Sequence, residues 1–212
     1  MCHPRVVTAS QTGAKRGRGR PPRTAEQRAD ARAVLVERSL VAIRDEGADI
    51  SIETLATRLG VGRSVIYDQF ESKTGIADAI ALHFVEQFDE GLTSRIADGE
   101  MTTPQDLARE SVRFLVDLID REPEYYRFSI RAMQATGAGV LDNGLARALR
   151  ARAEQFGLLG ARVGDDPSGR LLVDGIFGFL FASIESWQST GEPERETVVT
   201  RLTDAVTRLL NP

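Results

Sequence analysis

Two short helical runs joined by a tight glycine turn constrain the fold of this chain more than any other feature. Residues 51–73 read SIETLATRLGVGRSVIYDQFESK. Apolar residues recur at helical spacing on both sides of Gly60-Val61-Gly62. Helices of about two turns are marginal in isolation because nucleation is costly. The stretch therefore predicts a helix–turn–helix unit that a further helix holds in place.

The segment before this stretch predicts that further helix. Thr24 and Gln27 form a capping-box pattern, and Gly47 marks a helix end near Glu46. Ser72 is placed to cap a longer helix after the motif. The apolar stripe expected on the first helix is Ala29, Ala33, Val36, Leu40 and Ile43.

The rest of the chain also contains residues that typically start or end helices. Proline starts predict helices over about 103–121, from Pro123, over about 167–190 and from Pro193. A further helix is expected near 142–159, after Gly137 and Gly139. No stretch shows sustained alternation of apolar and polar residues. The expected fold class is all-α with about nine helices, the first three forming an N-terminal helix–turn–helix unit and the rest a larger C-terminal helical part.

Charge is unevenly distributed along the chain. Residues 1–75 hold 13 Lys/Arg against 9 Asp/Glu, although the whole chain carries a net charge of −4. Residues 1–23 lack helical periodicity and are rich in Gly, Pro and Arg, so they are expected to form a disordered basic arm. The predicted division is an arm over 1–23, a helix–turn–helix domain over 24–72 and a second domain over 73–212. A basic N-terminal segment followed by an acidic remainder favours a polyanionic partner at the N-terminal end.

Several protein classes are disfavoured by the composition. The chain shows no signal-peptide core, and Asp174 interrupts its longest apolar run, so a cytoplasmic protein without membrane spans is expected. Cys2, His3 and His83 are the only cysteine and histidines among 212 residues. No metal site, cofactor or enzymatic activity is therefore predicted.

The helix–turn–helix pattern has a physical reason in DNA recognition. A second helix held outward by a small core needs only enough length to enter a major groove about 12 Å wide. Double-stranded DNA is thus the expected partner. A small helical subdomain without a DNA role is the alternative.

The motif resembles the DNA-binding domain of the tetracycline-repressor (TetR) family. The residues that carry the resemblance are Leu55-Ala56, Leu59-Gly60-Val61, Ile66-Tyr67, Phe70 and Ser72-Lys73. They match the family pattern without a gap, and the match covers residues 24–90. The resemblance implies a homodimeric transcriptional regulator, usually a repressor, with a small-molecule site in the C-terminal domain.

The same resemblance suggests which side chains meet DNA. Arg63 is suited to a guanine edge, Gln69 to adenine and Val65 to a thymine methyl group. Tyr67 and Lys73 are expected at phosphates, which fix the register. The full predicted set in this motif is Ser51, Arg63, Ser64, Val65, Tyr67, Gln69 and Lys73.

Two features depart from the family pattern. Gly62 stands where a side-chain cap is common, and Asp68 and Gln69 stand where histidine or aromatic residues are frequent. An aspartate near phosphates is repelled unless it accepts a hydrogen bond from a cytosine amine. Ser64 and Asp68 are each open to a base contact or to none, and the operator sequence is not predicted.

The arm adds a second candidate DNA contact. Arg18-Gly19-Arg20-Pro21 resembles the core of an AT-hook, in which Arg18 and Arg20 would follow a narrow A·T minor groove. A sequence-independent phosphate tether is the alternative. Deleting residues 1–22 is expected to weaken DNA binding and to flatten its salt dependence, which a binding titration would measure.

The two C-terminal helices are expected to pair with those of a second copy. The 170–189 helix is apolar on several faces, as a buried helix is. By resemblance, it and the last helix form a four-helix dimer interface, although both could be intra-chain core. The predicted interface residues are Phe179, Ile184, Trp187, Leu202, Val206 and Leu209.

A ligand pocket is expected among aromatic and flexible apolar residues of the C-terminal domain. Ordinary core packing is the alternative for each of them. A hydrophobic or amphipathic ligand would suit such a pocket, with Arg113, Arg127 and Arg131 as candidates to orient it. The predicted pocket residues are Phe114, Tyr126, Met133, Phe156, Phe177 and Phe181.

The leading hypothesis is a ligand-responsive repressor that binds a palindromic operator as a homodimer. The rival is a constitutive or architectural DNA-binding factor without an effector. The sequence leaves open the operator, the effector, the regulated genes and the choice between repression and activation.

Overall fold

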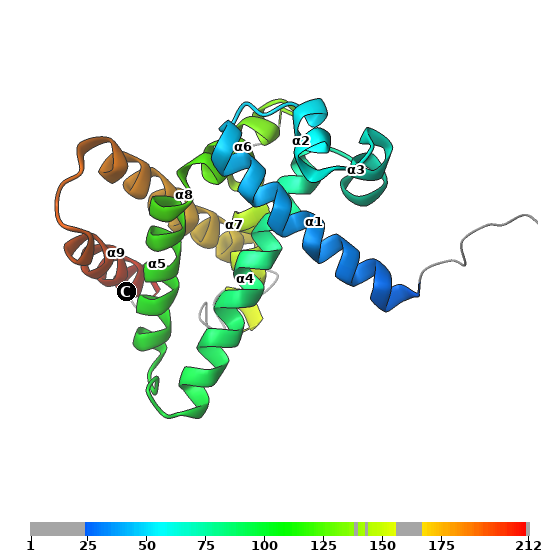
Figure 1. Cartoon of the computed structure of the whole chain (residues 1–212). Coiled ribbons are helices and arrows are strands. Elements are labelled where there is room, and N and C mark those ends of the chain that lie inside the picture. Colours follow the sequence, from blue (N-terminus) through cyan, green and yellow to red (C-terminus); the bar gives the residue numbers. More distant parts are fainter. Residues whose placement is uncertain (1–23, 138–139, 143, 156–166, 211–212) are drawn as a thin grey trace, which may run out of the picture.

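The fold is a bundle of helices in which a small N-terminal group sits on one end of a larger set (Figure 1). The computed structural model describes residues 24–137, 140–142, 144–155 and 167–210. These ranges contain nine α-helices and one short 3-10 turn, and no strand occurs within them. The elements are α1 (Ala25–Glu46), α2 (Ile52–Leu59), α3 (Arg63–Phe70), α4 (Lys73–Ala97), α5 (Pro104–Arg121), α6 (Pro123–Gln134), η1 (Val140–Asp142), α7 (Gly144–Gln155), α8 (Pro167–Thr190) and α9 (Arg195–Leu210). The predicted all-α class is confirmed.

Helix ends follow the local signals. Thr24 and Gln27 form the reciprocal capping box that starts α1, and Thr103 with Pro104 starts α5. The last helix begins at Arg195, later than the expected start at Pro193. The Pro193 carbonyl instead accepts a hydrogen bond from the Trp187 indole at 2.8 Å, so it lies in the connection that precedes the helix.

Helices α1 to α3 share a core with the start of α4. Ile43, Leu55 and Ile66 are almost fully buried there, as is Phe70 at the end of α3. This core is continuous with the one that runs through α4 to α9. The helix–turn–helix unit formed by α2 and α3 is therefore packed directly onto the larger helical set.

The first half of α1 projects away from this core (Figure 1). Ala29 and Ala33, expected on its buried stripe, are exposed, because the short α2 and α3 cover only the later turns of α1. The guanidinium of Arg32 lies 5.4 Å from the centre of the Phe70 ring. Its Nε donates to the Gln69 carbonyl at 3.5 Å. The apolar pattern overestimated how far the core extends along this helix.

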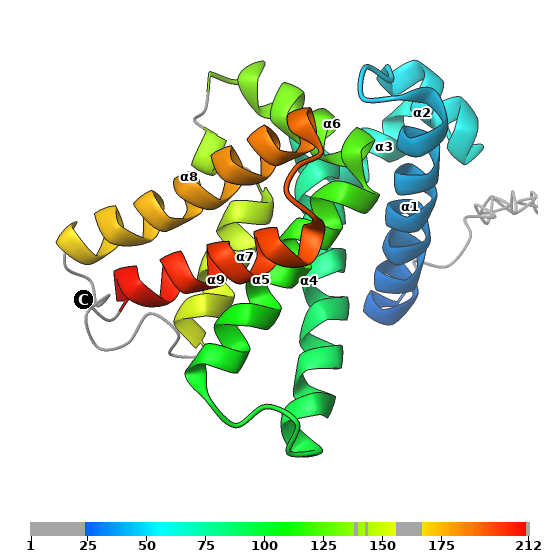
Figure 2. The ribbon, with the colours of Figure 1, turned by 90° about the vertical axis from the view of Figure 1, so that its left-hand side faces the viewer.

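The larger set is built around α4 and α5. Helix α4 contacts α6 and α7, and α5 contacts α9. Figure 2 shows α8 and α9 lying across the side of the molecule away from α1 to α3. No helix within the described ranges combines the length and apolarity that a membrane crossing requires.

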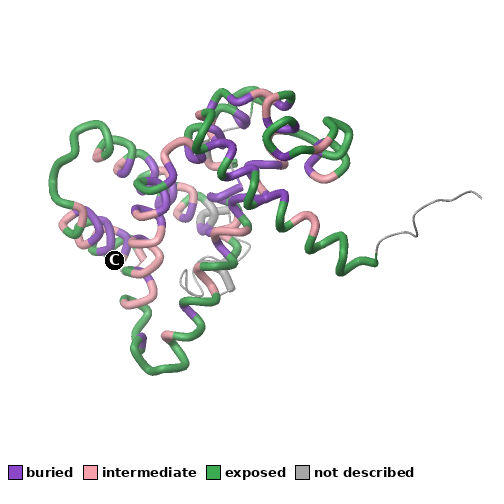
Figure 3. Tube along the Cα trace, viewed as in Figure 1, coloured by how far each residue is buried: buried purple, intermediate pink, exposed green. Residues whose placement is uncertain are grey.

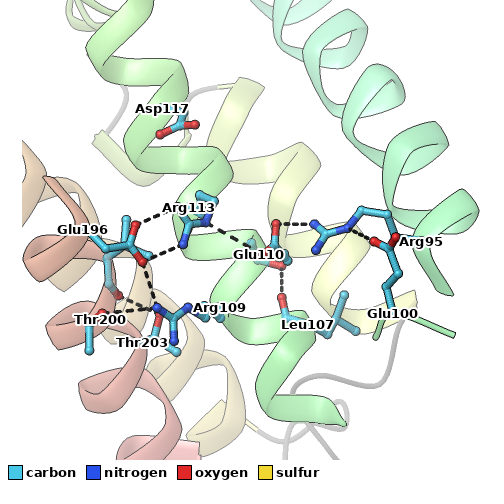
Figure 4. Close-up of polar contacts among 12 residues, drawn as sticks. Arg95, Glu100, Leu107, Arg109, Glu110, Arg113, Asp117, Glu196, Thr200 and Thr203 are labelled. Carbon is cyan, nitrogen blue, oxygen red and sulfur yellow. Dashed lines mark hydrogen bonds and ion pairs between the residues drawn. The ribbon is translucent and has the colours of Figure 1, made fainter. Parts of the chain in front are cut away.

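An ion-pair network ties α5 to α9 (Figure 4). Glu196 accepts two hydrogen bonds from Arg113 and one from Arg109, each at 2.8 Å. On the other side of α5, Glu110 accepts from Arg95 of α4 at 2.6 Å. The two arginines hold the pKa of Glu196 down, the hydrogen bond from Arg113 contributing most, to about 2.

The lowered pKa of Glu196 predicts a contribution to stability that is present at neutral pH and is lost in acid. A carboxylate with a lowered pKa contributes stability above its unfolded-state pKa of 4.5 and loses it as pH falls toward about 2. Glu196→Gln is therefore expected to be less stable than wild type at neutral pH, with the gap closing between pH 4.5 and 2. Thermal melts across this window check it, with exposed Glu86→Gln on α4 as control. A gap that does not change with pH would contradict the assignment.

Candidate nucleic-acid interface

The turn between α2 and α3 is closed by the backbone. Ser51 caps α2 by accepting the Thr54 amide at 3.0 Å. Gly60 ends α2 in the left-handed region at φ 68°, which glycine adopts without a Cβ clash. The Val61 amide donates to the Ala56 carbonyl at 3.0 Å. The chain thereby reverses within a few residues, which sets the angle between α2 and α3.

Helix α3 is buried on one face and open on the other. Ile66 and Phe70 are 1% and 3% exposed. Figure 3 shows most of the remaining α3 surface exposed. An eight-residue helix is about 12 Å long, which suits a major groove of similar width. The exposed residues on α3 are Arg63, Ser64, Val65, Tyr67 and Asp68.

The other predicted DNA contacts lie at the margins of this face. Gln69 is half-buried on α3, and Lys73 is half-buried at the first position of α4. Ser51 is committed to capping α2 and lies 2.9 Å from the Thr54 hydroxyl. Arg18 and Arg20 lie outside the described residues.

Glu53, which is not among the predicted DNA contacts, lies beside the predicted interface. Glu53, in the first turn of α2, lies 2.6 Å from Arg63 of α3, measured from Oε1 to Nη1. The pKa of Glu53 is lowered by its own backbone N–H and by the Arg63 guanidinium. The two residues are ten positions apart, so no helical periodicity links them. Only the turn brings them together.

A cavity of about 430 Å³ lies between α4 and α5. The Phe88 and Phe114 rings stack there with centroids 4.4 Å apart. Arg44 from α1 and Glu122 also line it. Phe114 lines this cavity, as does Arg113, one of the arginines predicted to orient a ligand.

The other described pocket residues lie in the packed core. Tyr126 stacks on Phe181 at 6.2 Å between ring centroids, and Phe177 lies 6.5 Å from Phe181. Burial raises the pKa of Tyr126 to about 12. Met133 is 1% exposed, and Phe156 lies outside the described residues. The structure thus brings Tyr126, Phe177 and Phe181 together, and none of the three is among the residues that line the cavity beside Phe114.

A second cavity, of about 450 Å³, lies between α8 and α9. Phe179, Trp187 and Leu202 are among the residues that line it. Phe179 is 39% exposed and Leu209 is 44% exposed. With Leu171 of α8, which is also exposed, three large apolar side chains remain open to solvent on the two helices expected to pair.

Three of the predicted interface residues are buried inside a single chain. Ile184 has no exposed surface, and Leu202 and Val206 are each 6% exposed. Helices α8 and α9 both pack on α5, so these side chains belong to the core of one chain. An interface on these helices would instead use Phe179, Trp187 and Leu209.

Comparisons with known proteins agree on the fold. No protein-family model matches the sequence. The chain is 26% identical over 194 residues to an uncharacterized HTH-type transcriptional regulator of Mycobacterium tuberculosis, covering 87% of this chain and 79% of that protein. A TetR transcriptional regulator from Rhodococcus sp. superposes with a TM-score of 0.57 at 20% identity, over 88% of this chain and 97% of the other.

A second solved structure gives the same result. The fatty acid degradation regulator FadR from Bacillus halodurans superposes with a TM-score of 0.55 at 15% identity, over 84% of this chain and 97% of the other. The chain therefore has the fold of the TetR-family transcriptional regulators, which confirms the resemblance predicted from residues 51–73.

Proposed function

We propose that this protein is a transcriptional regulator that inserts α3 into the major groove of an operator. One observation carries the proposal: Ile66 and Phe70 anchor α3 while Arg63, Val65 and Tyr67 face solvent. Polar, cationic and aromatic groups on a short outward helix suit base edges and phosphates.

A homodimer is supported by the surface of α8 and α9. Phe179 and Leu209 are exposed there, and a cavity separates the two helices. A second copy related by two-fold symmetry would cover these side chains and present two recognition helices to a palindromic site. One recognition helix alone reads few bases, so pairing also supplies specificity.

Introducing a charge at Phe179 is expected to break this dimer. Phe179→Glu would bury an unpaired carboxylate in the proposed interface, which is costly. The sedimentation coefficient should fall from that of a dimer to that of a monomer. Leu82→Glu, at a similarly exposed leucine on α4, is the matched control and should remain dimeric. A Phe179→Glu variant that sediments as wild type would rule out this interface.

Effector control is supported by the cavity between α4 and α5. Its stacked Phe88 and Phe114 rings offer an apolar wall, and the charged side chains of Arg44 and Glu122 also line it. A hydrophobic or amphipathic molecule suits such a lining. Because Arg44 belongs to α1, occupancy would bear directly on the helix that supports α2 and α3. The effector would favour a dimer whose recognition helices no longer fit successive grooves, and the protein would act as a repressor.

DNA binding tests the proposal directly. Fluorescence anisotropy on duplexes from upstream of the protein's own coding region should show salt-sensitive binding. Arg63→Ala is expected to weaken binding about tenfold, within the ~1–3 kcal/mol of a good base contact. Arg147→Ala removes the same charge from an exposed position on α7 and should leave binding unchanged. If the wild-type protein binds no duplex, even at low ionic strength, the proposal is overturned.

A further inference from the structure

Glu53 and Arg63 form an ion pair on the surface proposed to meet DNA. Nη1 of Arg63 lies 2.6 Å from Oε1 of Glu53, and the side chains are 61% and 63% exposed. Each residue sits in the first turn of its helix. The pair therefore bridges the N-terminal ends of α2 and α3 on their open side.

We propose that Glu53 is a positioning residue that holds the Arg63 guanidinium ready to read guanine. The inference rests on the proposed DNA-binding function. A guanidinium carries five N–H donors in a fixed planar fork. The carboxylate of Glu53 engages Nη1, which leaves the donors of Nη2 and Nε for the O6 and N7 acceptors of guanine. Fixing one side of the fork orients the other.

The free protein and the complex differ in how strongly this pair acts. An exposed ion pair contributes little in water, because solvent screens it and the side chains lose rotamer freedom. A groove that excludes water lowers the local dielectric and strengthens the same contact. Glu53 thus acts mainly when Arg63 is at a base edge, where a guanidinium without a partner would sample other bases and phosphates.

The sign of the charge makes this role distinguishable from simple attraction to DNA. Glu53 is negative, so alone it is repelled by phosphates. Removing its charge is expected to maintain or raise affinity for DNA in general while lowering the preference for guanine. A residue needed only for folding of α2 would instead lower binding to every duplex.

Glu53 also has a local structural role that the test must separate. An acidic residue in the first helical turn interacts favourably with the helix dipole. Glu53→Asp keeps that charge but shortens the side chain by one methylene, which withdraws it from Arg63. Glu53→Gln keeps the length and removes the charge. Both variants are checked for folding by thermal melts before binding is measured.

The experiment begins by selecting duplexes from a random pool with the full-length wild-type protein. Guanines that depend on Arg63 are those whose enrichment disappears with Arg63→Ala. Anisotropy then compares the selected duplex with one in which those guanines are replaced by adenine. Wild type should prefer guanine by about tenfold or more. Glu53→Gln and Glu53→Asp should prefer guanine by no more than about threefold. If Glu53→Gln binds the adenine duplex at least as tightly as wild type does, the lost preference is not caused by misfolding.

Three results would overturn the inference. The first is a full guanine preference in both Glu53 variants. The second is an equal loss of affinity for both duplexes, which would assign Glu53 a structural role only. The third is a guanine preference that survives Arg63→Ala, which would mean that another residue reads guanine. In each of these cases the wild-type protein still selects DNA, so the proposed function stands. Enrichment of no duplex by wild type would overturn both.

Discussion

Replacing Gly75 by alanine is expected to lower the free energy of unfolding by about 3 kcal/mol, at the upper end of overpacking costs. A Cβ at Gly75 would lie 1.8 Å from the carbonyl oxygen of Phe70 and 2.9 Å from its carbonyl carbon. Both are backbone atoms, so no side-chain rotation relieves the clash. The end of α3 would have to move away from the start of α4, where Ser72 accepts the Gly75 amide at 3.0 Å.

Chemical denaturation of Gly75→Ala and Gly91→Ala checks this prediction with a matched pair. Gly91 lies in the same helix, and a Cβ there would meet nothing within 4 Å. Alanine at Gly91 is expected to stabilise the protein by about 0.5–1 kcal/mol, because glycine is a poor helix former. Equal stabilities for the two variants would show that the α3–α4 junction is not tightly packed.

The second large effect is expected at the contact between α1 and the α5–α6 corner. Arg44 Nε donates to Glu122 Oε2 at 2.6 Å, and a second bond joins Nη2 to the other carboxylate oxygen. The side chain of Glu122 is only 11% exposed, whereas that of Arg44 is 48% exposed. The hydrogen bond to Glu122 raises the pKa of Arg44. Next to this pair, Glu124 accepts the Ala48 amide at 2.8 Å.

Unequal burial predicts unequal mutational effects. Arg44→Met would leave the buried Glu122 carboxylate without its cation and should cost about 2–3 kcal/mol of stability. Glu122→Gln leaves an arginine that water can solvate and should cost about 1 kcal/mol. Arg127→Met, which breaks an exposed pair with Glu124, serves as control and should cost less than about 1 kcal/mol.

Urea unfolding of the three variants measures these differences. The informative quantity is the order of the losses, with Arg44→Met largest and Arg127→Met smallest. A larger loss in Glu122→Gln than in Arg44→Met would mean that the carboxylate is better solvated than its exposure indicates. Because Arg44 and Glu122 also line the α4–α5 cavity, the same variants should be examined for altered DNA binding.

Local chemistry explains which parts of the fold were predictable. Thr24, Ser51, Ser72 and Thr103 start helices because each hydroxyl satisfies a backbone amide within three residues. Gly60 ends α2 because its left-handed backbone needs no Cβ. Both partners of each contact are near neighbours in sequence, so a short sequence pattern is enough to predict the contact.

Burial was predicted less well, because an apolar pattern identifies one face of a helix but not the element that packs against that face. Ala29 and Ala33 match the stripe of α1 yet remain exposed, since no helix reaches them. Ile184 and Val206 match an interface pattern yet pack inside one chain. The α4–α5 cavity depends on side chains from three helices, so its lining cannot be derived from any one segment.

The sequence by itself determined the hydroxyl-capped helix starts, the turn at Gly60 and the outward-facing residues of α3, because each depends on hydrogen bonds and periodicity within a few residues. Only the tertiary structure decided that Glu53 meets Arg63 and that Arg44 meets Glu122. The second pair joins residues 78 positions apart. Such charge pairs arise where helices cross, and the crossing is set by packing of the whole core.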